Sequence, residues 1–591
     1  MFRRRALATF TAAAAAATFV VGATTTDAAA KHPKPTPPNR VVIVLFDQMV
    51  PQYADQFAMP NFRALRDSGT NFKKAYLGYM ASETVIAHNV ITSGLEPRHM
   101  GWTDEAYRDH ANVFGKGADQ MHITGDLSLA DFATIEKNNG VVYPKLADYL
   151  HTAYPGTKFI TVGEKSYAVE SATGATGDIA VRLGSRKSNF NAYNDPSSPG
   201  CPNLAIPSAP GINQQWRGPA GKNVPSYLLA SMPGDPTACG RYFVNADKAN
   251  HYGTKDAFPS WLYPGEGNRF VPGNDPAHLG GDTWAGDAAI EMMQKENWSG
   301  MFITMGGIDK AGHMWGAQAD TAPQDCATLA GQTHVECAAE NADVQLGKIL
   351  AAIHQVDAQK GGRTLVVLTA DHGATYGQDF HGKTTVTAGD SNWYYAPPDL
   401  GVWDAGSQGV LDKITYSNPS PDVAALNADG NVQFSYQSTA IEAWLLTRSK
   451  AAKKAKAEQL LDLPGVTAAY WKNDAGDAFR LQGTNKMTRS EKDWWKEHGQ
   501  DIVDTMAAPD GPDVIGLLHD RTSYGVYGDH GGAQESVQRV PMVFWTSGTG
   551  GSNGCRTNES FRTPDVMPTI LRAMGIHLSS STDGRAHSLG G

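Results

Sequence analysis

Val41-Val-Ile-Val-Leu-Phe46 runs directly into Asp47 and decides the fold. Short runs of apolar, β-branched residues are typical of buried strands. Three more runs end in similar side chains: Met301–Met305 before Asp309 and His313, Thr364–Thr369 before Asp371 and His372, and Tyr524–Tyr527 before His530. In open α/β sheets, ligands gather just beyond the carboxyl ends of the strands. The four runs therefore predict a sheet edge rich in carboxylates and imidazoles.

Helical patterns alternate with these runs along the chain. We expect helices over 59–66, 84–92, 143–153, 284–295 and 341–356, further strands over 72–76 and 158–162, and a closing helix over 563–574. Such alternation is typical of an α/β fold, in which helices cover both faces of a mostly parallel central sheet.

Two long stretches interrupt the alternation. Residues 168–280 are rich in Gly, Pro, Asn and Ser, whereas 385–510 are rich in aromatic residues and contain expected helices over 438–446 and 452–461. Loops of this length are uncommon in compact domains, so we expect two insertions that form a cap over the active-site face. The catalytic domain would span 40–580, with its core over 40–165, 282–382 and 512–576 and a flexible tail over 581–591.

The N-terminal residues have the pattern of an export signal. Arg3 to Arg5 form a basic region, Ala12 to Val21 an apolar one, and Ala28 to Ala30 a small-residue cleavage site. We therefore expect a signal peptide over 1–30, a Pro-rich leader over 31–39, and secretion by the Sec or Tat route. No segment is long enough to predict a membrane span, which needs about 20 apolar residues.

The charge and the cysteine content further limit the functional class of the protein. The formal net charge of −10 argues against a nucleic-acid-binding surface, and the basic run over 450–456 reads as a solvated helix face. Five cysteines in an exported chain predict disulfides. Proximity along the chain suggests Cys326 with Cys337 and Cys201 with Cys239, which leaves Cys555 unpaired.

The acids and histidines at the strand ends are suited to a metal site. Carboxylates and imidazoles are the usual ligands of zinc and related divalent ions, and manganese or iron would also fit. Asp309 and His313 lie four residues apart, so a helical turn places both on one side. A single Asp or His at a strand end is more often a cap. Four strand ends with the same chemistry favour a metal centre instead.

Thr84 is the candidate nucleophile. It opens the helix expected over 84–92, where unpaired backbone N–H groups and the helix dipole favour negative charge. A hydroxyl held near a divalent ion loses its proton more easily, which would let Thr84 attack at neutral pH. The alternative is that Ser82 or Thr84 serves only as a helix N-cap.

In their order along the chain, these motifs resemble those of the alkaline phosphatase superfamily, and within it those of the type I phosphodiesterase and nucleotide pyrophosphatase branch. Ser93-Gly-Leu-Glu-Pro-Arg-His-Met-Gly101 approximates the branch pattern Thr-Gly-x-x-Pro-x-x-His-Gly, with His99 one position early. The resemblance implies two zinc ions and a covalent intermediate on Thr84. It assigns one zinc to Asp309, His313 and His530, and the other to Asp47, Asp371, His372 and Thr84. His88, one turn after Thr84, is expected to be structural.

Two departures from the family bear on the substrate. Asp104 and Glu105 lie where related phosphodiesterases place an Asn that contacts phosphate, so the acids could instead face a cationic headgroup or be solvated loop residues. A related phosphomonoesterase branch has Lys-x-Arg where this chain has Lys165 and Tyr167. Because a monoester dianion benefits more from two cations, the missing arginine favours diesters, and Lys165 can still contact phosphate.

The expected function is therefore that of a secreted di-zinc phosphodiesterase with a small-molecule substrate. Glycerophosphodiesters such as glycerophosphoethanolamine and glycerophosphocholine, or phospholipid headgroups, are favoured. A nucleotide pyrophosphatase, a phosphomonoesterase or a phosphonate hydrolase of the same fold are alternatives, and a non-catalytic secreted binding protein is a more remote one. A sulfatase is disfavoured because no Cys/Ser-x-Pro-x-Arg segment is present.

Overall fold

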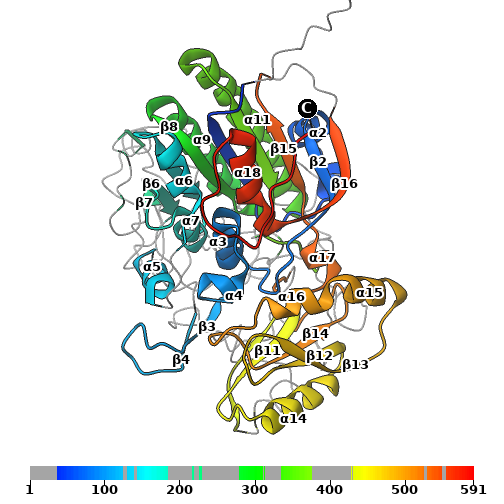
Figure 1. Ribbon diagram of the computed structural model, residues 1–591. Helices are drawn as coiled ribbons and strands as arrows, with labels where there is room; N and C mark the ends of the chain where they lie inside the picture. The colour runs from blue at the N-terminus through cyan, green and yellow to red at the C-terminus, as the bar shows by residue number, and fades with distance from the viewer. Residues whose placement is uncertain are drawn as a thin grey trace, which may run out of the picture. The chain divides into compact units, whose positions relative to one another are not determined.

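A nine-stranded sheet organises the core (Figure 1). Its strand order is β16-β2-β15-β9-β1-β8-β5-β6-β7, and five of its eight neighbouring pairs are parallel, namely those of β16 with β2, β9 with β1, β1 with β8, β8 with β5 and β5 with β6. The strands are β1 (Arg40–Phe46), β2 (Thr70–Tyr76), β5 (Lys158–Gly163), β6 (Ile179–Leu183), β7 (Trp216–Arg217), β8 (Trp298–Met305), β9 (Thr364–Thr369), β15 (Met542–Thr546) and β16 (Cys555–Arg562).

The structure is a computed structural model that describes residues 36–123, 129–138, 143–183, 216–217, 222, 225, 227–228, 279–309, 312, 334–375, 428, 430–524, 529–548 and 554–590. The expected signal peptide, the leader through residue 35 and most of the first insertion lie outside these ranges. Among the described residues, none of the helices combines the length and the apolar composition that crossing a bilayer requires.

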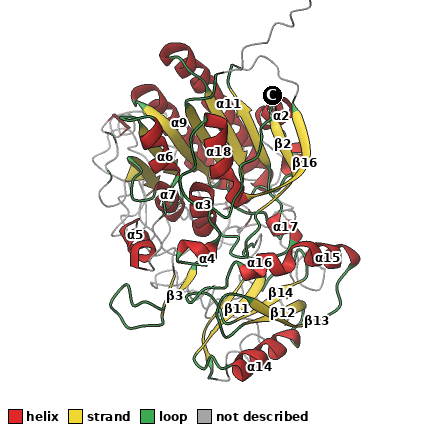
Figure 2. Cartoon of the chain, viewed as in Figure 1, coloured by secondary structure: helices red, strands yellow, loops and turns green. Residues whose placement is uncertain are grey.

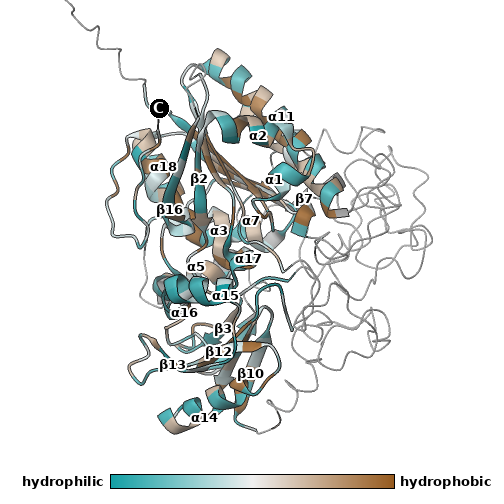
Figure 3. Cartoon of the chain, turned by 90° about the vertical axis from the view of Figure 1, so that its right-hand side faces the viewer, coloured by the Kyte–Doolittle hydropathy of each residue, from teal (hydrophilic) through white to brown (hydrophobic). Residues whose placement is uncertain are grey.

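Alternate residues of β1 pack on opposite faces of the sheet, as period-2 strand geometry requires. Val42, Val44 and Phe46 enter one buried cluster together with residues of α2 (Pro60–Ser68), α9 (Leu279–Lys295) and α11 (His334–Lys360). Val41, Ile43 and Leu45 enter another, with residues of α6 (Leu146–Ala153) and α18 (Val566–Met574). Helices therefore cover both faces (Figure 2), and the central strands are hydrophobic (Figure 3). The predicted fold class is confirmed.

A second, antiparallel sheet has five strands in the order β10-β11-β14-β12-β13. They are β10 (Val432–Gln437), β11 (Ala440–Leu445), β12 (Val466–Lys472), β13 (Phe479–Thr484) and β14 (Val514–Leu518), accompanied by α14 (Lys450–Leu461), α15 (Arg489–Trp494), the π-helix η7 (Trp495–Gly499) and α16 (Gln500–Asp504). The helix predicted over 438–446 is wrong, because that segment forms β11. The helix predicted over 452–461 is confirmed as α14.

The remaining described elements are shorter or serve as connections. They are α1 (Tyr53–Gln56), α3 (Thr84–Ser93), α4 (Pro97–Met100), β3 (Ala106–Asp109), β4 (Gln120–Ile123), α5 (Leu129–Asn138), α7 (Ser166–Thr173), α17 (Glu535–Gln538) and the 3-10 helix η8 (Thr563–Asp565). Gly94 is the C-cap of α3, and its φ of 71° is the left-handed conformation that glycine adopts without steric cost.

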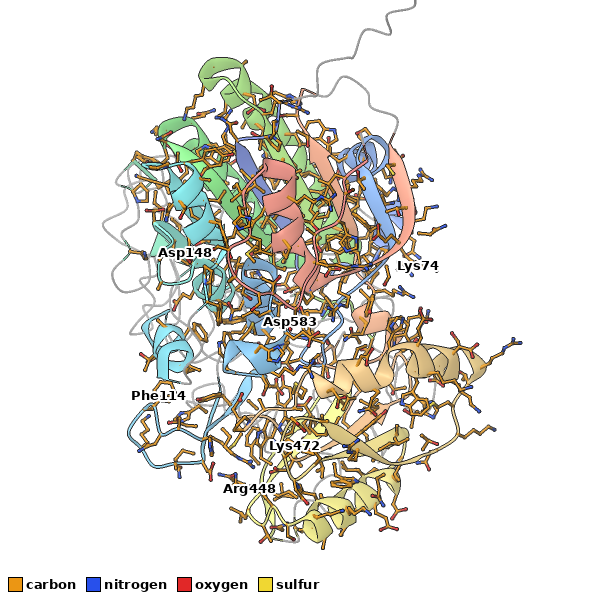
Figure 4. All side chains as sticks on the ribbon, viewed as in Figure 1. Lys74, Phe114, Asp148, Arg448, Lys472 and Asp583 are labelled. Atoms are coloured by element: carbon orange, nitrogen blue, oxygen red, sulfur yellow. The ribbon has the colours of Figure 1, made fainter. Side chains whose placement is uncertain are left out.

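Buried polar contacts join the second sheet to the core. Trp494 Nε1 donates to Ala533 O at 2.8 Å, and Met80 N donates to Thr505 Oγ1 at 2.9 Å. Since buried polar groups stabilise a fold only when they are paired, these two contacts help fix the second sheet and its helices on the core. Lys472, labelled in Figure 4, lies in β12, and its Nζ donates to the carbonyls of Ala508 and Gly511 at 2.7 and 2.9 Å, within the segment that forms the second sheet.

The C-terminal residues also contact the core. Asp583 accepts hydrogen bonds from Glu96 N at 2.7 Å and from His99 Nδ1 at 2.9 Å. His587 is buried, and its Nε2 lies 2.9 Å from Asp565 Oδ2. Residues 581–590, for which we expected a flexible tail, are thus held by side-chain contacts in this structure.

Of the five cysteines, two lie among the described residues. Cys337 is buried in α11, and Cys555 is a free thiol at the start of β16. Cys201, Cys239 and Cys326 lie outside the described residues, so both predicted disulfides stay predictions.

Candidate metal centre

Four neighbouring strands of the central sheet deliver the candidate side chains to one edge. The order β9-β1-β8-β5 is parallel throughout, so the carboxyl ends of all four strands meet there. Asp47 follows β1, Asp309 follows β8, and Asp371 follows β9. Lys165 follows β5 and caps the start of α7. These four residues therefore lie at one edge of the sheet, and their role as a site stays a prediction.

The acids and histidines form two adjoining clusters. Asp47, Asp371 and His372 have ligand atoms within 4.8 Å of one another, and so have Asp309, His372 and His530. The rings of His372 and His530 stack with centroids 3.6 Å apart. His372 thus belongs to both clusters, whereas the resemblance had assigned it to one. His313 lies outside the described residues, and its role stays a prediction.

Both histidines are oriented as metal ligands usually are. His372 Nδ1 donates to Gly373 O at 3.1 Å, and His530 Nδ1 donates to Ser82 O at 3.2 Å. Each Nε2 therefore keeps its lone pair. His372 Nε2 lies 3.5 Å from oxygens of Asp47 and Asp371, and His530 Nε2 lies 3.5 Å from Asp309 Oδ1. A backbone acceptor on one ring nitrogen is the usual support for metal binding by the other.

Electrostatics also suit bound cations. Burial, followed by repulsion from Asp371, raises the pKa of Asp47 well above its ordinary value. Burial likewise raises the pKa of Asp371 and, together with the neighbouring His530, lowers that of His372. The site therefore disfavours extra negative charge and a protonated imidazole. Carboxylates and neutral imidazoles are the donors that a bound divalent ion stabilises. The residues present fit a zinc-like centre.

Thr84 occupies the first position of α3, beside His372, which belongs to both clusters. Its Oγ1 is 3.4 Å from His372 Nε2 and accepts a hydrogen bond from Lys165 Nζ at 3.1 Å. The N-cap of α3 is Glu83, and no side chain caps this end. The hydroxyl of Thr84 is therefore directed at the site rather than at the helix backbone.

Lys165 is a buried cation at the centre of the cluster. Its Nζ lies 2.7 Å from Asp47 Oδ2 and 2.6 Å from Asp309 Oδ2. Burial opposes the charge, but the two carboxylates outweigh it and raise the pKa of Lys165 well above its ordinary value. Lys165 is therefore positively charged beside the candidate nucleophile.

Two supporting residues have roles in the site that the sequence did not predict. Gln48 has a φ of 65°, and it donates from N to Asp371 Oδ1 and from Nε2 to Asp309 Oδ1, both at 3.1 Å. Ser82 Oγ accepts from Gly531 N at 3.0 Å and from Gly532 N at 2.9 Å, which fixes the segment that carries His530. Their partners lie hundreds of residues away in the sequence, so no local pattern predicts them.

His88 supports α3 from within the core. Its Nδ1 donates to Thr84 O at 2.7 Å, and its Nε2 lies 2.9 Å from Thr304 Oγ1. Burial lowers the pKa of His88 to about 3, so the imidazole is neutral and accepts from the threonine hydroxyl. These contacts match the structural role expected for it.

A second group of acids lies next to the nucleophile. Glu83, Asp104 and Glu442 are each 1% exposed, and their carboxyl groups interact in a chain with Asp104 in the middle. Burial, then the neighbouring acids, raises the pKa of Glu83 and Glu442 well above ordinary values. Glu105 is only partly buried and adds repulsion to Glu83. Sequence analysis had identified Asp104 and Glu105 but missed Glu83 and Glu442.

Comparison with known proteins tests the resemblance. Residues 41–125 match the family model described as "Type I phosphodiesterase / nucleotide pyrophosphatase". The wild-type alkaline phosphatase PafA aligns at 13% identity over 93% of this chain and 98% of its own, with a TM-score of 0.57. The chain has the fold of the alkaline phosphatase superfamily. The resemblance inferred from the motifs is thereby confirmed.

Another solved structure aligns with a lower TM-score. Murine ectonucleotide pyrophosphatase / phosphodiesterase 5 aligns at 10% identity over 93% of this chain and 97% of its own, with a TM-score of 0.46. No curated protein matches the chain in sequence. The family match and the ligand clusters together identify this alkaline phosphatase-like chain as a metal-dependent phosphoester hydrolase.

Proposed function

We propose that the chain is a secreted phosphodiesterase that holds two zinc ions and uses Thr84 as its nucleophile. The observation that carries the proposal is the position of Thr84 Oγ1, which lies 3.4 Å from His372 Nε2 and 3.1 Å from Lys165 Nζ at the start of α3. A hydroxyl among acids, imidazoles and one buried ammonium is suited to nucleophilic attack on phosphorus.

The proposed ligand sets are those that the family resemblance implies. Asp309, His313 and His530 would hold one ion, and Asp47, Asp371, His372 and Thr84 would hold the other. When bound, the ions would supply Lewis-acid stabilisation of charge on the phosphoryl oxygens and the attacking oxygen.

The chain's own groups account for orientation and proton balance. The Lys165 ammonium stabilises the deprotonated oxygen of Thr84, because it already donates to Oγ1. Backbone N–H groups at the start of α3 favour the phosphoryl anion. Attack of Thr84 Oγ1 on phosphorus breaks one P–O ester bond, and the departing alkoxide takes up a proton from water to replace the proton that Thr84 gives up to water. The phospho-threonine that remains still carries the second ester group, and water hydrolyses it to the monoester.

Small diesters with a cationic headgroup are the substrates that the acid cluster favours. Asp104 is buried, so we assign the direct contact with an ammonium to the partly buried Glu105. If the variant pair Asp104→Asn and Glu105→Gln discriminates between glycerophosphocholine and a neutral glycerol diester as wild type does, this assignment is wrong.

A phosphomonoesterase is the second candidate, because Lys165 contacts Thr84 and a fixed cation stabilises a monoester dianion. The test is to compare kcat/KM on bis(4-nitrophenyl) phosphate and 4-nitrophenyl phosphate, with metal content measured on the same preparation. We expect a preference for the diester, about two zinc ions per chain, and loss of both metal and activity on chelation. Thr84→Ala should retain the metal but lose turnover. Turnover by Thr84→Ala at the wild-type rate would contradict the covalent mechanism.

A further inference from the structure

A cavity of about 220 Å³ lies apart from the metal centre, where the second sheet meets the start of α17. Its volume corresponds to roughly seven water molecules, since each occupies about 30 Å³ in the liquid. The lining residues are Thr467, Met487, Thr488, Ser490, Glu491, Trp494, Trp495, Gly499, Leu517, Leu518, Asp520, Ala533, Gln534 and Glu535. In Figure 1, α15 and α16 lie close to α17 above the strands of the second sheet.

Two indole rings give the cavity its apolar wall. Trp494 Nε1 donates to Ala533 O at 2.8 Å, and Trp495 Nε1 donates to Tyr470 Oη at 2.7 Å. Both N–H groups are therefore used elsewhere, which leaves ring carbon surface for a ligand. Met487, Leu517 and Leu518 extend this wall. Such a wall is typical of small-molecule sites.

The backbone beside the wall is unusual. Trp495 to Gly499 form a π-helix, a conformation that is rare and frequent at functional sites. Gly499 allows Trp495 to lie against it, because a Cβ at this position would lie 2.5 Å from Trp495 Cδ1. The π-helix and its glycine thus set the position of the Trp495 ring.

The polar groups of the lining carry one sign of charge. Glu491, Asp520 and Glu535 line the cavity, and within the described part of the chain no Lys, Arg or His is among the lining residues. Although burial opposes it, hydrogen bonds from His519 and from the N–H groups of Thr488 and Asp520 lower the pKa of Glu491 to about 2. Glu491 is therefore ionised across the physiological range.

Among the described residues, the guanidinium of Arg539 compensates part of this charge. Arg539 Nε lies 3.2 Å from Glu535 Oε1, and its guanidinium also lies 4.6 Å from the Trp494 ring centroid. His519 Nδ1 lies 3.0 Å from Glu491 Oε1. Asp520 Oδ1 accepts from the N–H and hydroxyl of Ser536. These donors are neutral, and among the residues that the structure describes no cation forms an ion pair with Asp520.

We propose that this cavity is a second binding site that takes a compact organic cation, an ammonium carried on a short alkyl chain. Aromatic rings and ionised carboxylates around an apolar space bind such cations by cation–π attraction and charge complementarity. A purely apolar ligand would leave the acids uncompensated, and an anion would be repelled by them.

The test compares two ligands of the same shape on the metal-loaded, full-length protein. Choline is the cationic probe, and 3,3-dimethyl-1-butanol is its uncharged counterpart. Binding is measured by titration calorimetry and by quenching of tryptophan fluorescence. We expect choline to bind at least about tenfold more tightly than the alcohol, as one cation–π contact with charge complementarity predicts. Equal affinity, or no binding of choline at millimolar concentration, would overturn the proposal.

Variants locate the bound cation. Asp520→Asn and Trp495→Leu should each weaken choline binding about tenfold. Glu497→Gln is the matched control, since Glu497 lies in the same π-helix but outside the lining, with a side chain that is 76% exposed. Choline bound at the metal centre would be unaffected by all three substitutions, which would refute the assignment. If circular dichroism shows that Trp495→Leu does not fold, the Asp520→Asn variant and the comparison of choline with the uncharged alcohol still test the proposal.

Discussion

Lys165 Nζ lies 2.6 Å from Asp309 Oδ2 in the centre of the ligand clusters. The same ammonium lies 2.7 Å from Asp47 Oδ2, so one cation contacts an acid of each cluster. All three side chains are almost fully buried. An unpaired buried charge is costly, and Lys165 therefore compensates the acids whenever divalent ions are absent.

Lys165→Met should destabilise the metal-free protein more than the metal-loaded one. Removing one partner of a buried ion pair costs about 3–5 kcal/mol, whereas bound divalent ions would compensate the same acids. The free energy of unfolding in urea, with and without a chelator, measures both values. Lys158→Met is the control, because its partner Glu296 is 2.6 Å away but Lys158 is 41% exposed. That control should lose less than about 1 kcal/mol in either state. Equal losses for Lys165→Met in both states would contradict the argument.

Glu442→Gln should make stability less sensitive to rising pH. Burial, then Asp104, raises the pKa of Glu442 in the folded protein. A raised pKa means that the folded state binds more protons than the unfolded state, so this contribution to stability is lost as pH rises through the folded pKa. The unfolding free energy of wild type should therefore fall relative to Glu442→Gln between pH 5 and 9. Glu458→Gln, on the exposed face of α14, should follow wild type. A constant difference between wild type and Glu442→Gln would refute the raised pKa.

Local patterns in the sequence predict the core but not the pairing in the second sheet. The run over 41–46 is apolar at every position, and such runs indicate strands buried on both faces, as β1 is. The segment over 438–446 mixes Ala, Glu and Leu, which favour a helix, with Ile, Thr and Trp. Pairing of β11 with β14, more than seventy residues away, overrides that local preference.

The sequence likewise predicts some residues of the candidate site but not others. Asp47, Asp371 and His372 follow strands directly, so strand prediction locates them at the sheet edge. Gln48 and Ser82 contact groups that are 323 and 449 residues away, and only the folded chain brings them together. Glu442 reaches Asp104 because β11 is a strand, so the helix predicted there concealed the acid cluster.

Lys472→Met should show the opposite pH dependence from Glu442→Gln. Burial is the main cause that lowers the pKa of Lys472 to about 8 from 10.5. Between those values the unfolded state binds more protons than the folded state, so wild-type stability rises with pH over this window. Relative to Lys472→Met, wild type should gain about 3 kcal/mol from pH 8 to 10.5, at 1.36 kcal/mol per pKa unit.

Urea unfolding across that range checks the Lys472 prediction. Lys486→Met is the control, because Lys486 is exposed and its removal should leave the pH dependence of wild type unchanged. Below pH 8 the difference between wild type and Lys472→Met should be constant. A difference that stays constant up to pH 10.5 would show that Lys472 keeps an ordinary pKa.

Asp583→Ala should release the C-terminal residues from the core while the metal centre stays intact. Asp583, which is labelled in Figure 4, accepts from Glu96 N at 2.7 Å and from His99 Nδ1 at 2.9 Å. Hydrogen bonds to a charged group contribute about 1.5–3 kcal/mol each, so the variant should raise the local opening of 577–590. The measurement is the rate of proteolytic cleavage within that segment.

His99→Ala tests one of the two hydrogen bonds by itself, because it removes the imidazole donor and leaves the Glu96 N–H in place. It should therefore raise the cleavage rate less than Asp583→Ala does, and the double variant should behave like Asp583→Ala. If all three variants are cleaved at the wild-type rate, the carboxylate of Asp583 does not hold the tail, and other contacts, such as that of His587 with Asp565, must do so.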